Sequence, residues 1–267
     1  MEFKDLGKTG EKIPTIGWGT WKYGADPKEE VSALKLGFER GFRFVDTAEM
    51  YNSETIVGEA IKDAEDIFVA TKVSPSHFDY DGVMNACDGS LKRLGIRQID
   101  LYQLHWPNKS IPISETMRAM EKLVDDGKIR YIGVSNFSEG EIEEAQGVLK
   151  HNEIVSDQVE YSVLVRQIEN GLMDYCRKNR ISIIAYSPLG QGKLYSKKYS
   201  RLYELLEGIG RSHGKSATQV ALNWVVSKEN VVAIPKAGSA KHVLEDCESA
   251  GWKLDKEEME KINSFLA

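Results

Sequence analysis

The chain has 267 residues, 41% of them hydrophobic, so it is long and apolar enough to bury a large core. The formal net charge is −6 and no Lys/Arg-rich run is present, which argues against nucleic acid and anionic membranes as partners. The charged N-terminus has no apolar signal core and no window is apolar enough to span a bilayer, so we expect a cytoplasmic protein. Cys87, Cys176 and Cys247 are then expected to be free thiols.

Short runs rich in β-branched and aromatic residues recur along the chain and predict strands. In chain order they lie at 15–21, 42–48, 67–73, 99–106, 129–137, 156–162, 181–189 and 230–237. Amphipathic segments such as 27–41 and 138–152 separate them and predict helices. Capping-box pairs mark three helix starts, namely Ser138 with Glu141, Ser216 with Gln219, and Asp255 with Glu258.

This alternation predicts an α/β fold with a parallel sheet covered by helices. Eight such units in a chain of this length favour a closed (β/α)8 TIM barrel, and a doubly wound open sheet is the alternative. The segment KDLGKTGEKIPTIG before the first unit contains a Lys-Thr-Gly turn and predicts a short β-hairpin at the barrel bottom. Residues 251–267 predict an extra C-terminal helix, and no linker divides the chain, so we expect one domain over residues 1–267.

Polar residues follow three consecutive strands where the apolar runs end. Asp46, Lys72 and His105 occupy these positions, and Tyr51 comes five residues after Asp46 in a predicted loop. Each strand-end residue alone has an ordinary structural explanation, as a helix cap, a solvated charge or a satisfied core histidine. Because functional groups of a barrel lie at the C-terminal ends of its strands, the coincidence on three neighbouring strands favours an active site.

The chemistry of these four side chains suits the addition of hydride to a carbonyl. A tyrosine has a reference pKa of about 10, and a buried cation beside it favours the phenolate and lowers that pKa. Lys72 supplies the cation and Asp46 keeps it charged. Tyr51 then donates a proton to a developing alkoxide, and His105 holds the same oxygen by a hydrogen bond. The set contains no nucleophile for acyl transfer.

The chain resembles the aldo-keto reductase family, as a short, prokaryotic-type member, over almost its whole length. The resemblance is carried, in order, by the motifs FRFVDTAEMYNSETIVGEAI, FVATKV, LYQLHWP, IGVSNF, QVEYS, IAYSPLG and AIPKA. It implies a barrel that binds NADP(H) across the strand C-termini without a Rossmann domain, and no G-x-G-x-x-G motif is present. It also implies reduction of aldehydes and ketones, with Tyr51 as proton donor, Lys72 and Asp46 tuning it, and His105 orienting the carbonyl.

The resemblance further implies cofactor contacts. Ser135, Asn136 and Gln158 correspond to groups that bind the nicotinamide carboxamide, and Tyr186 to the ring stacked on the nicotinamide. Structural alternatives exist, since Asn136 and Ser138 suit helix caps and Tyr186 suits a core aromatic. The other implied contacts are Gly19, Thr20, Trp21 and Asp46 beside the nicotinamide ribose, and Ser187 and Leu189 along the pyrophosphate.

The same resemblance assigns the choice between NADP(H) and NAD(H) to residues at and just after the end of the eighth predicted strand. Lys236 matches the family position that meets the adenosine 2′-phosphate, and Ser239 is read equally as a phosphate ligand or a helix cap. His242 stands where many members have Arg, and a neutral imidazole lacks the guanidinium fork, so NADH use remains open. Asn52 stands beside Tyr51 where many members have Gly, and we expect no loss of activity from it.

The expected substrate pocket is apolar and open, because the loops that shape specificity in the family are short here, as in residues 190–200. We therefore expect broad reduction of small aldehydes and some ketones. The residues expected to line it are Trp21, Tyr51, His105 and Trp106, with Trp18, Phe78 and Tyr80 as further candidates and Trp18 equally suited to the core.

Two other classes of protein compete with the reductase. A sensor module that binds NADP(H) without turnover would use the same barrel, and the intact set Asp46, Tyr51, Lys72 and His105 argues against it. A metal-dependent hydrolase would need several His and carboxylate ligands at strand ends, where only His105 qualifies, so no metal site is predicted. As with most active members of the family, we expect a monomer whose partner is a small carbonyl compound.

Overall fold

The computed structural model of the chain describes residues 2–236 and 238–265. Eight parallel strands form one sheet in which chain neighbours are also sheet neighbours. The strands are β3 (Trp18–Gly19), β4 (Phe44–Asp46), β5 (Phe68–Val73), β6 (Ile99–Leu104), β7 (Ile129–Ser135), β8 (Ile154–Glu160), β9 (Ser182–Tyr186) and β10 (Val231–Ile234). Parallel bridges from Ile16 to Ala233 and from Gly19 to Lys236 join the first strand to the last. The predicted barrel is confirmed, and the open-sheet alternative is wrong.

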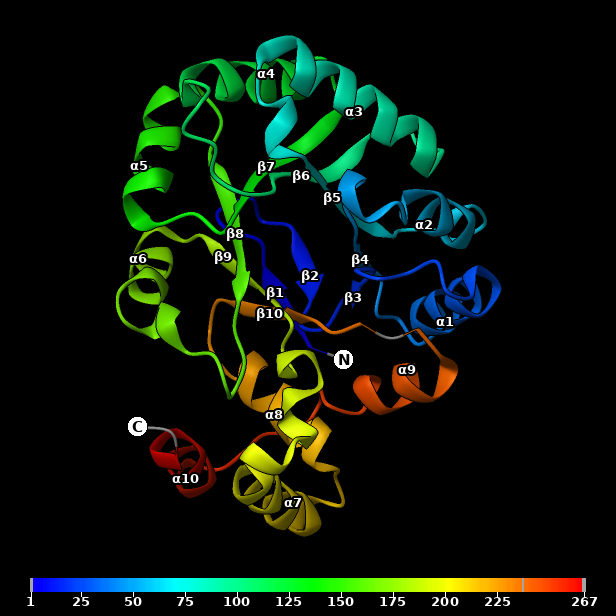
Figure 1. Ribbon diagram of the computed structural model, residues 1–267, viewed down its shortest axis with the longest axis vertical. Coiled ribbons are helices and arrows are strands. Elements are labelled where there is room, and N and C mark those ends of the chain that lie inside the picture. Colours follow the sequence, from blue (N-terminus) through cyan, green and yellow to red (C-terminus); the bar gives the residue numbers. More distant parts are fainter. Residues whose placement is uncertain (1, 237, 266–267) are drawn as a thin grey trace.

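Helices follow the strands and cover the outside of the ring (Figure 1). They are α1 (Pro27–Glu39), α2 (Glu54–Ile61), α3 (Tyr80–Leu94), α4 (Ile113–Asp125), α5 (Glu139–Val148), α6 (Leu172–Asn179), α7 (Ser200–His213), α8 (Ala217–Val226), α9 (Ala240–Cys247) and α10 (Lys256–Phe265). Short 3₁₀ turns are η1 (Glu49–Tyr51), η2 (Pro75–His77), η3 (Gln167–Glu169), η4 (Gly190–Tyr195) and η5 (Lys197–Tyr199). The predicted C-terminal helix is α10. The unit after β9 carries two helices, α7 and α8, which the sequence pattern did not separate.

All three predicted capping boxes form. At the starts of α5 and α8, the hydroxyl oxygens of Ser138 and Ser216 accept from the backbone N–H three residues later. In return, the backbone N–H of each serine donates to the side chain of Glu141 or Gln219. At the start of α10, the backbone N–H of Glu258 donates to Asp255 Oδ1 at 2.8 Å and the Asp255 N–H donates to the Glu258 carboxylate at 2.9 Å. Each pair satisfies donors that a helix start leaves unpaired, which is why these helices begin where the sequence indicated.

The predicted N-terminal hairpin consists of β1 (Phe3–Asp5) and β2 (Lys12–Pro14), and it lies inside the ring of strands in Figure 1. Leu6 and Ile13 are fully buried and pack with inward-facing strand residues, among them Phe44. These residues form the inner core of the barrel. The hairpin also meets Ser182, the first residue of β9, whose hydroxyl donates to the Asp5 carbonyl at 3.0 Å. It therefore closes the end of the barrel where the strands begin and leaves the opposite end for a site.

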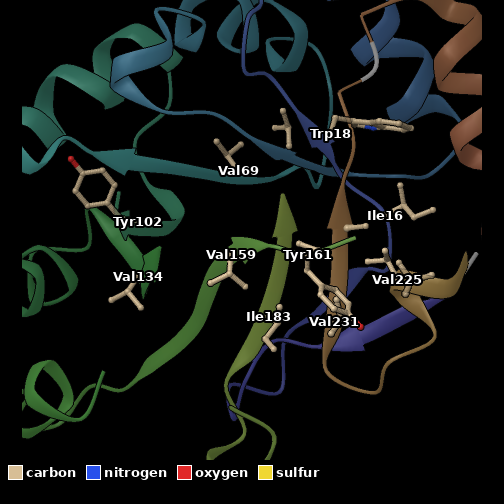
Figure 2. Packing of buried hydrophobic residues seen from close by; sticks show 14 of the residues in the cluster. Ile16, Trp18, Val69, Tyr102, Val134, Val159, Tyr161, Ile183, Val225 and Val231 are labelled. Carbon is tan, nitrogen blue, oxygen red and sulfur yellow. The ribbon is translucent and has the colours of Figure 1, made fainter. Parts of the chain in front are cut away.

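A second, larger core, the outer core, fills the space between the outer faces of the strands and the helices. Figure 2 shows part of it, including Trp18, Tyr102 and Ile183. The Trp18 indole is fully buried and donates to the Phe42 carbonyl at 2.9 Å. Phe78 is also buried in this layer. The core alternative for Trp18 is therefore the one the structure adopts, and the prediction that Phe78 lines the pocket is wrong.

We expect Lys4→Met to weaken the attachment of the hairpin. The Lys4 ammonium donates to the carbonyl oxygens of Val226 (2.6 Å), Lys228 and Val231 (2.7 Å), and burial lowers its pKa to about 8, so it stays mostly protonated at neutral pH. Losing these charged hydrogen bonds should lower the free energy of unfolding by about 2–3 kcal/mol in urea denaturation. Lys12→Met, which removes an exposed ion pair with Asp5 at 3.8 Å, is the control. Equal stability of the two variants would contradict the prediction.

Candidate active site

A cavity of about 750 Å³ opens at the C-terminal ends of the strands. The predicted site residues that line it are Gly19, Thr20, Trp21, Asp46, Tyr51, His105, Trp106, Ser135, Asn136, Gln158, Tyr186, Ser187, Leu189, Lys236 and His242. Lys72 lies beneath the lining, fully buried. Trp18, Phe78, Tyr80 and Ser239 are not among the residues that line the cavity.

Asp46 and Lys72 form a buried ion pair at the floor of this cavity. Asp46 pairs in register with Ala70 on β5, so Lys72, two residues further, faces the same side of the sheet. The Lys72 ammonium donates to Asp46 Oδ1 at 2.5 Å and to the Thr47 carbonyl at 2.7 Å. Burial is the largest effect and lowers the pKa of Lys72, but Asp46 and Tyr51 together raise it above the ordinary value. The lysine is therefore charged, as the sequence predicted.

The 3₁₀ turn η1, which follows β4, places Tyr51 beside the Lys72–Asp46 ion pair. Its hydroxyl lies 3.2 Å from His105 Nε2, and the two rings meet edge to face with centroids 5.3 Å apart. The Lys72 ammonium lies 4.9 Å from the centre of the Tyr51 ring. Asn52 ends the turn with φ of 56°, a left-handed conformation that Asn tolerates better than most residues. Asn52 thus accommodates the left-handed geometry that ends this turn.

The Tyr51 phenol holds its proton more firmly than the sequence predicted. Burial raises its pKa, Lys72 lowers it and Asp46 raises it, and the net pKa lies above the ordinary value. Lys72 acts in the predicted direction, but the predicted net direction is wrong, because burial of the phenol outweighs the neighbouring cation. In the protein without substrate, Tyr51 is a neutral acid beside a charged ammonium group.

His105 is a neutral imidazole in this site. Burial, and then the charge of Lys72, lower its pKa to about 3. Among the described residues, its Nδ1 atom is buried and has no hydrogen-bond partner. A buried N–H without an acceptor is costly, so the single ring proton belongs on Nε2, toward Tyr51 and the cavity. The imidazole can therefore donate a hydrogen bond to an oxygen held between the two rings.

The next strands contribute a set of amides and hydroxyls. The Ser135 hydroxyl donates to the backbone carbonyl of Gln158 at 2.8 Å. Asn136 donates to the His105 carbonyl at 3.2 Å and accepts from the Tyr186 hydroxyl at 3.0 Å. Ser138, not Asn136, caps α5, so the cap alternative holds for Ser138 alone. Asn136 and Tyr186 are instead tied together on the wall of the cavity.

A β-bulge decides which residue of β8 faces this wall. Ile132 pairs with Ile154, but the next residue, Gly133, pairs with Ser156, so β8 contains one extra residue. Because side chains alternate along a strand, the extra residue turns Gln158 into the barrel, opposite Ser135. Gln158 then reaches Asp46 Oδ2 with its amide nitrogen at 2.8 Å.

The far end of the cavity carries both signs of charge. The Lys236 ammonium donates to the Lys22 carbonyl at 3.0 Å, and the Ser239 hydroxyl lies 3.2 Å from His242 Nδ1. Ser239 is the N-cap residue of α9, although its side chain makes no cap hydrogen bond with the described residues. Glu245 and Asp246 also line this end, but burial raises the pKa of Asp246 well above its ordinary value, so the acidic charge here is that of Glu245. Sequence reasoning missed them, although their spacing of three and four residues from His242 on one helix would have placed them on its face.

The mouth of the cavity is apolar. Trp21, Met50 and Trp106 line it and are among the most exposed large hydrophobic side chains of the described residues, at 42%, 54% and 48%. Trp21 and Trp106, which the sequence placed in the substrate pocket, both lie on the lining of this cavity. Met50 was missed, although it directly precedes Tyr51. Exposed apolar side chains gathered at one cavity indicate a binding surface.

No cluster of three or more His, Cys, Asp or Glu side chains suited to hold a metal ion exists among residues 2–236 and 238–265. Over the same residues, no helix has the length and apolar character needed to cross a membrane.

The fold and the site together define a (β/α)8 barrel with a buried Lys72–Asp46 ion pair at its strand ends, beside the rings of Tyr51 and His105. The Aldo/keto reductase family matches residues 15–267, and the chain belongs to this family. It is 39% identical to methylglyoxal reductase YeaE of Escherichia coli over 255 residues, which is 92% of this chain and 89% of that protein. It is 37% identical to a glyoxal reductase of Bacillus subtilis over 262 residues, 96% of this chain and 90% of that protein.

Solved structures agree with this assignment. A thermostable aldo-keto reductase in complex with the inhibitor epalrestat superposes with a TM-score of 0.92 at 42% identity, over 99% of both chains. An aldo/keto reductase from Klebsiella pneumoniae in complex with NADP and acetate gives a TM-score of 0.91 at 33% identity, over 98% of this chain and 95% of that one.

Proposed function

We propose that the protein is an NADP(H)-dependent carbonyl reductase that converts aldehydes and ketones to alcohols, with Tyr51 as proton donor. The observation that carries the proposal is the Tyr51 hydroxyl, 3.2 Å from a neutral His105 and beside the buried Lys72–Asp46 pair, at the floor of the cavity. The names of the relatives, methylglyoxal and glyoxal reductase, support carbonyl reduction, and the NADP-bound Klebsiella structure supports the cofactor.

The residues present fit a nicotinamide dinucleotide. The amides of Asn136 and Gln158 suit a carboxamide, and the Tyr186 ring suits a flat heterocycle. Lys236 lines the same cavity and supplies a cation for a phosphate group. When bound, the cofactor supplies the hydride. The other predicted contacts on the lining, Gly19, Thr20, Trp21, Ser135, Ser187 and Leu189, are proposed to hold the ribose and pyrophosphate.

The residues of the chain then handle the proton. His105 Nε2–H donates a hydrogen bond to the substrate oxygen and holds it next to the Tyr51 hydroxyl. As negative charge develops on that oxygen, Tyr51 gives up its proton. The phenolate that remains is stabilised by the Lys72 ammonium, which Asp46 keeps charged inside the barrel. Alcohol oxidation uses the same steps in reverse.

The test is loss of NADPH absorbance with glyoxal, methylglyoxal and aromatic aldehydes, run beside NADH. We expect turnover with NADPH on several small carbonyls, because the cavity mouth is open and apolar. The NADPH/NADH ratio of kcat/KM reports whether Lys236 suffices to select NADPH when α9 offers the imidazole of His242 and no guanidinium fork. Tight cofactor binding with no turnover on any carbonyl would contradict the reductase and favour the sensor module.

The pH dependence of reduction follows from the two pKa shifts at the site. The reaction needs protonated Tyr51, whose raised pKa keeps the proton in place as pH rises, so activity should fall only in strongly alkaline buffer. His105, with a pKa of about 3, stays neutral across the working range. We expect kcat to be flat between roughly pH 5 and 9 in a stopped assay at saturating substrate. A change of kcat with an apparent pKa near 6.5 that is absent in His105→Asn would contradict the expected flat profile.

A further inference from the structure

Gln103 is a buried amide in the centre of the site that no step above uses. It lies on β6, in register with Lys72 on one side and Gly133 on the other, and is fully buried. Its Nε2 donates to Asp46 Oδ2 at 3.2 Å, and its Oε1 accepts from Gln158 Nε2 at 3.4 Å. It therefore contacts both the residue that holds Lys72 and a residue proposed to bind the nicotinamide.

The hydrogen bonds fix how both amides point. An ionised carboxylate only accepts hydrogen bonds, so Gln103 and Gln158 must both turn their NH₂ groups toward Asp46 Oδ2. Lys72 occupies the other carboxylate oxygen, Oδ1. The carbonyl oxygen of Gln158 is then turned away from Asp46, on a side chain that lines the cavity. It is thus presented as an acceptor for an amide N–H of a ligand.

The neighbouring strand leaves room for this arrangement. A Cβ atom at Gly133 would lie 2.9 Å from Gln103 Cγ and 2.6 Å from Ser156 Oγ, so a side chain at Gly133 would displace Gln103. Leu101, two residues before Gln103 on the same face of β6, is apolar and packs in the inner core. An apolar side chain at Gln103 would leave Asp46 Oδ2 and one Gln158 N–H with fewer partners, although both side chains are almost fully buried.

We propose that Gln103 is a positioning residue that couples the proton-donating group to the nicotinamide-binding amide. It acts through Asp46, whose second oxygen it helps to satisfy, and through Gln158, whose amide it orients toward the cavity. The inference rests on the proposed function for the identity of the ligand, and on the hydrogen bonds of the described residues for the coupling itself.

The experiment is a double-mutant cycle of Gln103→Leu and Gln158→Leu, with the NADPH Kd read by quenching of protein fluorescence and kcat measured on one aldehyde. We expect Gln103→Leu alone to raise the NADPH Kd about tenfold and to lower kcat about tenfold. In the Gln158→Leu background, Gln103→Leu should change Kd no further, because the amide it orients is gone. Ser156→Ala, which removes a buried hydroxyl without a hydrogen-bond partner in the described residues, should match wild type and serves as control.

Additive effects of the two substitutions on Kd, or a wild-type Kd for Gln103→Leu, would overturn the proposal. If Gln103→Leu fails to fold, as judged by circular dichroism, Gln103→Met replaces it, since its unbranched side chain follows the same path. Because Kd is read without turnover, the cycle is informative even if wild type binds NADPH and reduces no carbonyl. That result would contradict the proposed function. The Kd values of the cycle would still test the coupling between Gln103 and Gln158.

Discussion

Tyr51→Phe is expected to abolish carbonyl reduction while NADPH still binds. The phenyl ring keeps the edge-to-face contact with His105, whose ring centre lies 5.3 Å away, and only the O–H group is lost. Loss of a positioned proton donor typically costs about 10²–10⁴-fold in rate. The measurement is NADPH oxidation on an aldehyde at saturation, with cofactor Kd determined by fluorescence on the same preparation.

Tyr131→Phe is the matched control for this substitution. Tyr131 lies on β7, packs beside the inner core of the barrel and accepts a hydrogen bond from Arg130 at 3.2 Å, but it does not line the cavity. Its phenyl variant should keep wild-type turnover. If Tyr51→Phe retained more than about a tenth of the wild-type rate, another group or water would have to supply the proton, and the proposed role of Tyr51 would be wrong.

Lys72→Met is expected to cost both stability and turnover. Removing one partner of a buried ion pair leaves the other charge uncompensated, and here Asp46 would stay in a site where it is 1% exposed. Such a change typically lowers the free energy of unfolding by about 3–5 kcal/mol. Turnover should fall as well, because the phenolate of Tyr51 would form without a neighbouring cation. Urea denaturation and the NADPH assay measure the two effects.

The double variant Lys72→Met with Asp46→Asn separates stability from catalysis. Replacing both partners removes the unpaired charge, so much of the lost stability should return. Turnover should not return, because the cation is still missing. A double variant that regains turnover would show that the charge on Lys72 is not needed. A stable Lys72→Met single variant would show that Asp46 is not left charged and unpaired.

The sequence pattern determined most of the fold, because buried parallel strands have a composition that surface segments lack. Runs such as 67–73 are apolar on both faces, and capping boxes such as Ser138 with Glu141 mark helix starts directly. The boundary between α7 and α8 was missed although Ser216 was recognised as a cap, because two short amphipathic segments look like one unit between two strands.

Two kinds of feature could not be predicted from sequence: how deeply a side chain is buried, and the register between neighbouring strands. The net pKa shift of Tyr51 depends on how completely it is buried, which residue types alone do not give. Phe78 was a further candidate for the apolar pocket, but its side chain packs into the outer core. One extra residue in β8 determines that Gln158 rather than Asp157 faces the cavity. Gln103 was not recognised as a site residue, although it lies within the motif LYQLHWP.

The contacts between the two ends of the sheet have a consequence for synthesis. Lys4 and its acceptor Val226 are 222 residues apart along the chain, and β3 can join β10 only once Val231–Ile234 has been made. At a translation rate of about 5–20 residues per second, the N-terminal hairpin waits on the order of tens of seconds for its partners. Until then the growing sheet has open edges, which favour pairing with other chains. The nascent chain is thus most prone to aggregate before its last strand emerges from the ribosome.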